Sequence, residues 1–359
     1  MEGAARLSGV NELPTPTWNY LHINDVPVSV PTGTTSPSCP PAEKIPGGTG
    51  PEASAWLSRS ADARESVVVT HGQRRERPVE LTVGGKDDAR IRDTLVTLCD
   101  DSEADVVVVA RSDRDGDATC GSRLRLDLAH GARAHVHVYV AMNDGYQYID
   151  DIGAALADDA SLDVHYHLLG AGLTVCGLRT ENVGFRAAVD VDVRYLCRGN
   201  QTLDMNYNLR LSGRKSTADL NAYGVLFDNA RKTLRDTIDL VRGGKGAQGN
   251  ENETVLLAGD GVVNKSLPVI LCDEEDVVGN HGATIGSVSE EQLQYLRARG
   301  LDDQAANALF ARSVIDSATS QAPTAAARDA ALFAARRFLG DDAVDDVLDA
   351  SGVEGKEEA

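Results

Sequence analysis

The chain has 359 residues, which is long for a single compact core but suits an elongated domain that grows by stacked repeats. Its formal net charge of −20 excludes nucleic acid and anionic membrane surfaces as favourable partners, because like charges repel. No stretch approaches ~20 apolar residues and the start lacks a signal-peptide pattern, so we expect a cytoplasmic protein.

Residues 1–64 are expected to form an extended leader. Between Asn11 and Pro51 this segment is rich in Pro, Gly, Ser and Thr, a composition with little apolar surface to bury. An aromatic island at residues 16–21, Pro-Thr-Trp-Asn-Tyr-Leu, is the exception. Large rings are rarely left in water, so we expect the island to dock on the body of the protein through Trp18.

Residues 65–286 show a strand-and-turn pattern. Short apolar blocks and alternating segments, such as residues 134–140 and 189–195, recur between Gly, Asn and Asp residues. Strands without intervening helices favour a β-solenoid, in which each coil buries one side and pairs its edges with the next coil. A β-sandwich is the competing fold, but sandwiches usually contain more aromatic core than the 4% Phe, Trp and Tyr found here.

Residues 287–359 are expected to be helical. Ser289-Glu290-Glu291-Gln292 is a capping box and Gly300 a helix stop, which predicts a short helix between them. Asp302 can cap a second helix, and the Ala-rich run at 324–339 predicts a third that stops at Gly340. A last short helix is expected over 343–348.

The six cysteines are far apart and form no CxxC pair, so we expect reduced and mostly buried thiols. The Gly243-Gly244-Lys245-Gly246 segment lacks the spacing of a phosphate-binding loop and is interpreted as a turn. The Ser, His and Asp residues match no nucleophile-elbow motif. These patterns indicate no catalytic machinery.

Residues 267–300 carry the most informative pattern. An acidic turn at 273–276 precedes His-Gly-Ala-Thr at 281–284, and a helix with a Glu-Gln-Leu…Tyr-Leu…Arg-Gly pattern follows. This arrangement resembles the signature of the SufB/SufD family, and the resemblance extends over about 220–315. SufB members carry a Glu where Gly282 stands and a functional Cys on an earlier strand, both absent here, so the resemblance is to SufD-like members.

The resemblance implies a right-handed parallel β-helix with a C-terminal helical region. It implies a non-catalytic scaffold subunit that assembles iron–sulfur clusters with a SufB-like subunit and a SufC-like ATPase, or pairs with itself when isolated. Residues 287–359 would then hold the ATPase. No stably bound cofactor is expected, only a transient cluster or iron at the interface with the SufB-like subunit.

His281 and Cys272 are the candidate metal ligands. A neutral imidazole is a good ligand for iron, and the glycines at 279 and 282 would let another backbone or a cluster approach His281 closely. Cys272 is the nearest thiol in the sequence. A hydrogen-bonded turn histidine and a buried core cysteine are the alternatives, and some SufD members have Cys where Gly279 stands.

Two His-x-His pairs, His135 with His137 and His165 with His167, each project from one strand face, since side chains alternate with period two. If the two strands were neighbours, four imidazoles would converge on a metal face. The spacing alone does not fix that register, and a polar face of the solenoid is the favoured interpretation.

A β-helical carbohydrate-active enzyme is the alternative function. Its acid pair would be sought at Asp150 and Asp151 or at Asp190 and Asp192. The scarcity of aromatic residues to stack on sugars and the unexplained 267–300 signature oppose this alternative.

Overall fold

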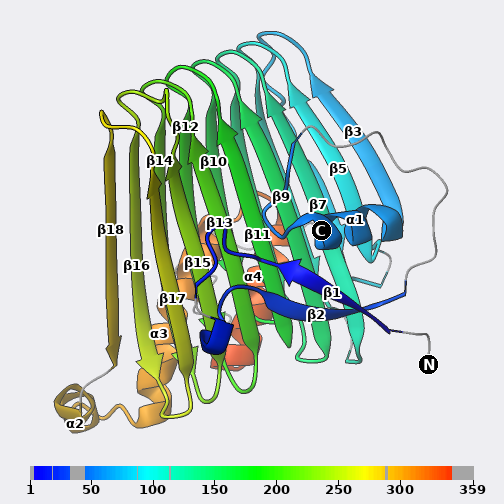
Figure 1. Cartoon of the computed structure of the whole chain (residues 1–359). Helices are drawn as coiled ribbons and strands as arrows, with labels where there is room; N and C mark the ends of the chain where they lie inside the picture. Colours follow the sequence, from blue (N-terminus) through cyan, green and yellow to red (C-terminus); the bar gives the residue numbers. More distant parts are fainter. Residues whose placement is uncertain are drawn as a thin grey trace.

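The structure, a computed structural model, describes residues 4–17, 19–32, 45–86, 88–112, 115–287 and 290–341. Two parallel eight-stranded sheets face each other along most of this length (Figure 1). Successive strands alternate between the two sheets, so each pair of strands completes one coil of a solenoid. The prediction of a mainly β solenoid, rather than a sandwich of antiparallel sheets, is confirmed.

The first sheet consists of β3 (Ala63–Val69), β5 (Ile91–Leu98), β7 (Ala118–Leu128), β9 (Tyr146–Leu156), β11 (Leu173–Asn182), β13 (Thr202–Leu211), β15 (Arg231–Leu240) and β17 (Val263–Cys272). The second sheet consists of β4 (Val79–Val83), β6 (Glu103–Arg111), β8 (Arg133–Ala141), β10 (Ser161–Leu168), β12 (Ala188–Cys197), β14 (Thr217–Phe227), β16 (Gln248–Ala258) and β18 (Val278–Ser287).

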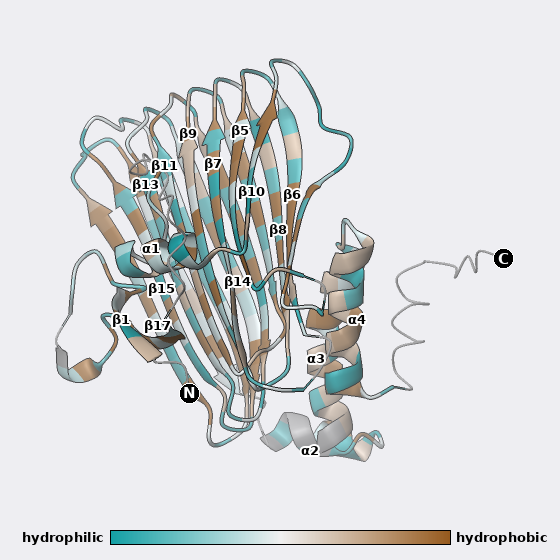
Figure 2. Ribbon diagram, turned by 90° about the vertical axis from the view of Figure 1, so that its right-hand side faces the viewer, coloured by the Kyte–Doolittle hydropathy of each residue, from teal (hydrophilic) through white to brown (hydrophobic). Residues whose placement is uncertain are grey.

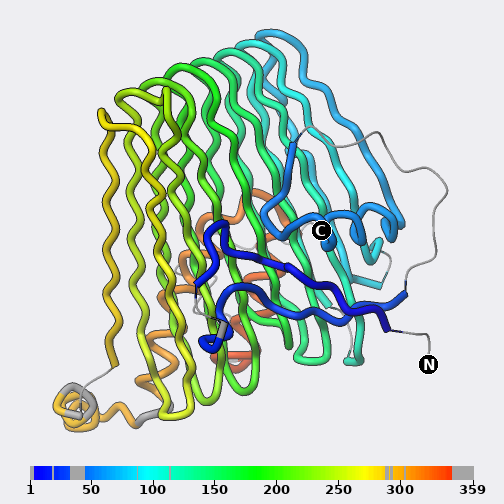
Figure 3. The backbone as a smooth tube through the Cα atoms, viewed as in Figure 1, coloured from blue at the N-terminus to red at the C-terminus, as the bar shows by residue number. Residues whose placement is uncertain are grey.

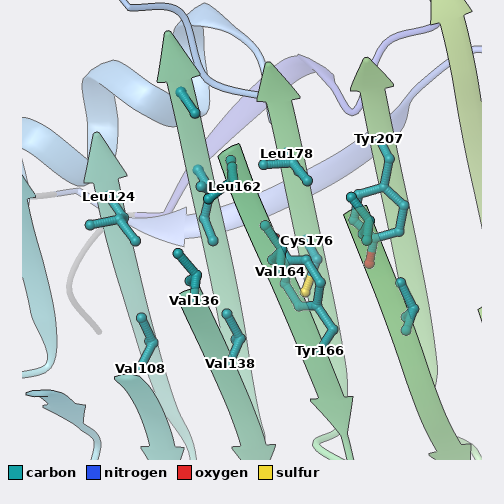
Figure 4. Packing of buried hydrophobic residues seen from close by; sticks show 14 of the residues in the cluster. Val108, Leu124, Val136, Val138, Leu162, Val164, Tyr166, Cys176, Leu178 and Tyr207 are labelled. Carbon is teal, nitrogen blue, oxygen red and sulfur yellow. The ribbon is translucent and has the colours of Figure 1, made fainter. Parts of the chain in front are cut away.

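Each strand pairs in register with the strand about thirty residues later, the period of a solenoid. Side chains in register therefore form columns along the solenoid axis, and alternate columns face the interior. Figure 4 shows Val, Leu and Tyr side chains of both sheets filling that interior. The alternating apolar residues of the sequence are these inward-facing columns.

One corner of the coils repeats the same backbone turn. Four residues there have a left-handed φ of 57°: Asp101, Asp159, Arg186 and Lys215. Each donates its backbone N–H to a carbonyl of the next coil, as Asp159 does to Phe185 at 2.8 Å. The left-handed conformation is unfavourable for residues with a side chain, but here it gives every coil the same hydrogen bond to its neighbour.

Three helices follow the last coil: α2 (Glu290–Ala298), α3 (Asp303–Ser320) and α4 (Ala325–Leu339). Helices α3 and α4 pack on the outer face of the second sheet (Figure 2). Asp302 caps α3 as predicted, accepting from the Ala305 N–H at 2.8 Å, and Thr324 caps α4. Ser289 of the predicted capping box and the helix predicted at 343–348 lie outside the described residues.

The leader contains regular structure in addition to extended chain. An antiparallel hairpin of β1 (Ala4–Val10) and β2 (Val26–Pro31), a short 3-10 helix η1 (Asn19–Leu21) and helix α1 (Pro51–Ser60) lie over the outer face of the first sheet (Figure 3). Trp18 lies outside the described residues, and Tyr20 and Leu21 are 66% and 42% exposed. The prediction for Trp18 therefore stays a prediction, while Trp56 of α1 is buried and donates to the Pro31 carbonyl at 3.1 Å.

Buried ion pairs hold this leader against the first sheet. Arg125 of β7 pairs with Asp151 of β9 at 2.5 Å and also donates to the Ser54 hydroxyl of α1. Asp151 accepts the Thr49 N–H at 3.0 Å. Burial favours the neutral acid, but the Arg125 guanidinium outweighs that effect and lowers the pKa of Asp151. A second buried pair, Arg235 with Asp204, repeats the arrangement farther along the sheet.

Replacing Arg125 by Ala is expected to destabilise the fold strongly, because it leaves the Asp151 carboxylate buried without its cation. We expect a loss of about 3 kcal/mol or more in the free energy of unfolding, measured by urea titration. Arg242→Ala is the matched control, since this side chain is 80% exposed and stands 3.7 Å from Asp273. The control should change stability by less than about 0.5 kcal/mol. Equal losses in the two variants would contradict the importance of the buried pair.

Candidate functional site: the open end of the solenoid

The solenoid ends in an uncovered coil made of β17 and β18. Both strands pair with a neighbour on one side only, because each is the last strand of its sheet. All ten residues of β18 are exposed. Ile285, which stacks in register on the interior residue Val255, is 51% exposed. Within the described part of the chain, this end therefore shows both a free pair of strand edges and the cross-section of the core.

His281 and Cys272 both belong to this terminal coil. His281 is in register with Glu251, whose side chain is buried in the interior, so His281 occupies an inward-facing column. Cys272 continues the inward column of Leu240 on the opposite sheet, is exposed, and lies 3.2 Å from the Glu274 carbonyl oxygen. The structure thus places both predicted residues on the open end, on two different strands.

The glycines beside His281 differ in what they face. A Cβ on Gly279 would point inward, 3.1 Å from Ile270 and 3.2 Å from Leu240. A Cβ on Gly282 would point outward, 3.0 Å from the Asn252 amide oxygen. A larger residue at 282 would thus lie on the outer face of the second sheet, whereas one at 279 would enter the interior beside the Cys272 column.

A polar cluster lies in the interior one coil below the open end. Lys232 of β15 forms an ion pair with Glu253 of β16, and both side chains are at most 3% exposed. Glu253 also accepts the Tyr195 hydroxyl at 3.1 Å, and Lys232 reaches the Ser266 hydroxyl at 3.1 Å. These charged residues stand in columns that are apolar deeper in the solenoid, where Leu203 and Ala222 occupy the matching positions.

Two further carboxyl groups in this cluster have unusual environments. Both oxygens of Glu251, which is 1% exposed, and one oxygen of Asp236 have no hydrogen-bond partner. Burial, and then the neighbouring charge of Asp236, raises the pKa of Glu251 to about 9. Burial, and then the charge of Glu253, raises the pKa of Asp236 to about 7. The neutral acid of Glu251 is thus favoured at neutral pH, on the strand next to His281.

Sequence reasoning missed this cluster, although the sequence contains a signal for it. Residues 248–254 read Gln-Gly-Asn-Glu-Asn-Glu-Thr, so β16 has no large apolar side chain in its first seven positions. Strands such as β8, β10 and β12 of the same sheet alternate apolar and polar residues there. A strand that is polar on both faces, and still pairs on both sides, must bury charged groups.

The carboxylates considered for an acid pair do not form one. Asp150 and Asp151 are adjacent on β9 and therefore point to opposite faces: Asp150 accepts from Ser122 inside the core, and Asp151 lies under the leader. Both are fully buried. Asp192 is held by a bidentate hydrogen bond from Arg194. No pair of these acids flanks a groove that a sugar chain could enter.

Three other sequence features are the 243–246 segment, the cysteines and the apolar content of the helices. The 243–246 segment forms a turn between β15 and β16, as predicted, with φ of 100° at Gly243. Of the cysteines, Cys120, Cys176 and Cys197 are buried and unpaired, as expected, while Cys39 lies outside the described residues. No helix in the described ranges is long and apolar enough to span a membrane.

Comparison with known proteins decides the family. The profile described as "SUF system FeS cluster assembly, SufBD core domain" matches residues 81–314, well over half of the chain and nearly the whole solenoid. The chain belongs to the SufB/SufD family. The match begins in β4 and ends in α3, so it includes the open end and leaves out the leader. The resemblance found in residues 267–300 is thereby confirmed.

Within the SufB/SufD family, the chain is a SufD-like member. It is 26% identical over 162 residues to the iron–sulfur cluster assembly protein SufD of Bacillus subtilis, covering 45% of this chain and 37% of that protein. It is 25% identical over 253 residues to SufD of Escherichia coli, covering 68% of this chain and 59% of that protein. A SufBD family protein of Methanocaldococcus jannaschii is 24% identical over 129 residues, 36% of this chain and 40% of that protein. The chain thus spans less than two thirds of these relatives.

Glu251 makes the pH dependence of stability testable. Because its pKa is raised to about 9 in the folded chain, from an ordinary value of 4.5, its contribution is fully present below pH 4.5 and is lost as the pH rises towards 9. Glu251→Gln, which stays neutral, should therefore be more stable than the parent at pH 8.5 and similar to it at pH 5. Thermal unfolding at both pH values measures the difference. Glu253→Gln is the control, expected to be destabilised at pH 8.5 because Lys232 loses its partner.

Proposed function

We propose that this chain is a non-catalytic scaffold subunit of an iron–sulfur cluster assembly complex in the cytoplasm, and that its open end binds a SufB-like subunit. The observation that carries the proposal is the uncovered terminal coil. A solenoid that ends in solution normally needs a polar capping element, and β17 and β18 have none among the described residues. Membership of the SufB/SufD family gives the class of partner.

The chemistry of the open end suits a strand-to-strand contact. Two parallel edges offer rows of unpaired backbone N–H and C=O groups, which a second β-helix can extend by β-augmentation. Ile285 at 51% and Val278 at 48% exposure add apolar contact area. A second copy of this chain would present the same surface, so a homodimer in isolation follows from the same argument.

The helical region is the proposed contact for a SufC-like ATPase. Helices α3 and α4 bury their inner faces on the second sheet, through residues such as Val314 and Ala331. Among the helical side chains that the structure describes, Tyr295 of α2 is 59% exposed and Leu309 of α3 is 52% exposed. Exposed apolar side chains on helices next to a rigid sheet are suited to hold a partner that moves.

His281 and Cys272 are the proposed contribution of this subunit to the cluster, which passes through the complex as cargo. Both stand on the open end, so a bound partner would enclose them. An imidazole and a thiolate are ligands that iron accepts. The carbohydrate-active alternative has no supporting observation, because Asp150 and Asp151 are buried on opposite faces of one strand.

Co-purification separates the two proposed contacts. Ile285→Lys places a charge on the exposed core of the open end and should abolish capture of the SufB-like subunit while the ATPase still binds. Leu309→Asp should have the opposite selectivity. Val68→Lys on β3, at 58% exposure and at the other end of the solenoid, is the matched control. If Ile285→Lys retains the SufB-like subunit in full stoichiometry, the open end is not the interface and the proposal is wrong.

His281→Ala should leave folding and assembly nearly unchanged, since its exposed side chain contributes little packing, but should lower cluster formation by the complex. Cys272→Ala should have a smaller effect. The measurement is iron and sulfide content of the reconstituted complex, followed together with subunit stoichiometry. Normal cluster content in His281→Ala would make this residue structural, and a larger loss in Cys272→Ala would reverse the ranking of the two ligands.

A further inference from the structure

The outer face of the second sheet brings two histidines together away from the open end. His137 of β8 and His165 of β10 are in register on adjacent parallel strands. Their rings are stacked, with centroids 5.0 Å apart and an interplanar angle of 17°. The two His-x-His motifs therefore lie on adjacent strands but are offset by two residues. The second histidine of the β8 motif is paired with the first histidine of the β10 motif.

The two charged groups next to this pair, His135 and Asp192, already have partners. His135 forms an ion pair with Asp163, with 2.9 Å between Nδ1 and Oδ2. Asp192, the next residue of the same column, is held by Arg194. His167 is fully buried and stacks on Tyr139, whose hydroxyl donates to the Ala318 carbonyl of α3. His135 and Asp192 are thus held by charged partners. Both ring nitrogens of His167 are buried without a hydrogen-bond partner, but its ring lies against Tyr139, beneath helix α3.

The Nδ1 atoms of both His137 and His165 are buried and have no hydrogen-bond partner. A buried ring nitrogen without a partner is unfavourable by the cost of its lost hydrogen bond to water. Burial, and then the imidazole of His165, lowers the pKa of His137 to about 4, so its ring is neutral and keeps a free lone pair. Two adjacent imidazoles with unused ring nitrogens are a ligand set that a divalent transition metal ion accepts.

The surrounding charge favours a cation. Asp163, Asp190 and Asp219 stand in register on β10, β12 and β14, one column away from the histidine pair. Burial, and then the charges of Asp163 and Asp219, raise the pKa of Asp190. The chain as a whole carries −20. This potential concentrates cations at the sheet face.

We propose that His137 and His165 together bind one divalent transition metal ion on the outer face of the second sheet. The strand separation of about 4.8 Å and metal–nitrogen bonds of about 2.1 Å allow both rings to reach one ion after a small tilt. No three His, Cys, Asp or Glu side chains among the described residues stand ready around one point. The pair therefore supplies two ligands, and water completes the coordination. This site is separate from His281 and does not rest on the proposed function.

Calorimetric titration of the tag-free full chain with Zn²⁺ tests the site. We expect one ion per chain at the histidine pair, and a loss of affinity of about tenfold or more in His137→Gln and in His165→Gln, because each variant removes one of two protein ligands. The double variant should bind no better than either single variant. His135→Gln, on the same face of β8 but already paired with Asp163, is the matched control and should retain the parent affinity.

Three results would overturn the site: glutamine variants that bind Zn²⁺ like the parent, no binding by the parent, or binding lost in His281→Ala or Cys272→Ser instead. The last result would locate the ion at the open end. A measurement without mutation guards against variants that fail to fold. In the chain labelled at its eight histidines, Zn²⁺ should shift the ring resonances of two of them. If Zn²⁺ shifts no histidine resonance, the proposal is refuted. It is also refuted if the shifted resonances belong to histidines other than His137 and His165.

Discussion

The parallel in-register pairing of one coil with the next is the constraint on which the rest of the structure depends. Once Arg133 is opposite Ser161, and Ser161 opposite Ala188, every side chain is assigned to a column and every column to the interior or the outside. An apolar column such as Val136, Val164, Val191 can then extend without limit. Each column keeps its place from coil to coil, and only the residue type in it changes. The polar and ionisable sites of the molecule arise where such a change introduces a charged residue.

Buried charges show how these changes are accommodated. On the outside of the first sheet, Asp93, Arg123 and Asp151 occupy successive positions of one column, so opposite charges alternate at the strand spacing. The opposite charges offset part of the desolvation cost that burial beneath the leader imposes on each of them. The interior holds a polar group at Asp150, which accepts from Ser122, and it holds ionisable residues again in the last coils, where Glu251 replaces the Leu220 of the preceding coil. The core thus becomes richer in ionisable groups where it approaches the open end, the surface that we propose for assembly.

The sequence predicted the class of fold, two helix caps and the segment of the open end, because these depend on local patterns of period two, capping residues and a family motif. It did not predict which strands are neighbours, since register depends on turn lengths spread over the whole chain. The corner residues Arg186 and Lys215 show the reason: neither is a typical left-handed turn residue, and only the hydrogen bond to the next coil explains them. The burial of Trp56 likewise was not predicted, because its apolar cluster includes Ile149 and Val175, which lie about a hundred residues later in the chain.

The docking of the leader has a consequence for the order of folding. The Asn11 amide donates to the Cys176 carbonyl and to Asp204, a partner 193 residues later. Gly48 packs so closely on β11 that a Cβ there would lie 2.2 Å from the Leu178 nitrogen. The leader therefore has no binding surface until coils that follow it in the chain have stacked. It can dock only after the strands around Leu178 and Asp204 have formed, so the face that it covers is completed late in folding, although the leader is synthesised before those strands.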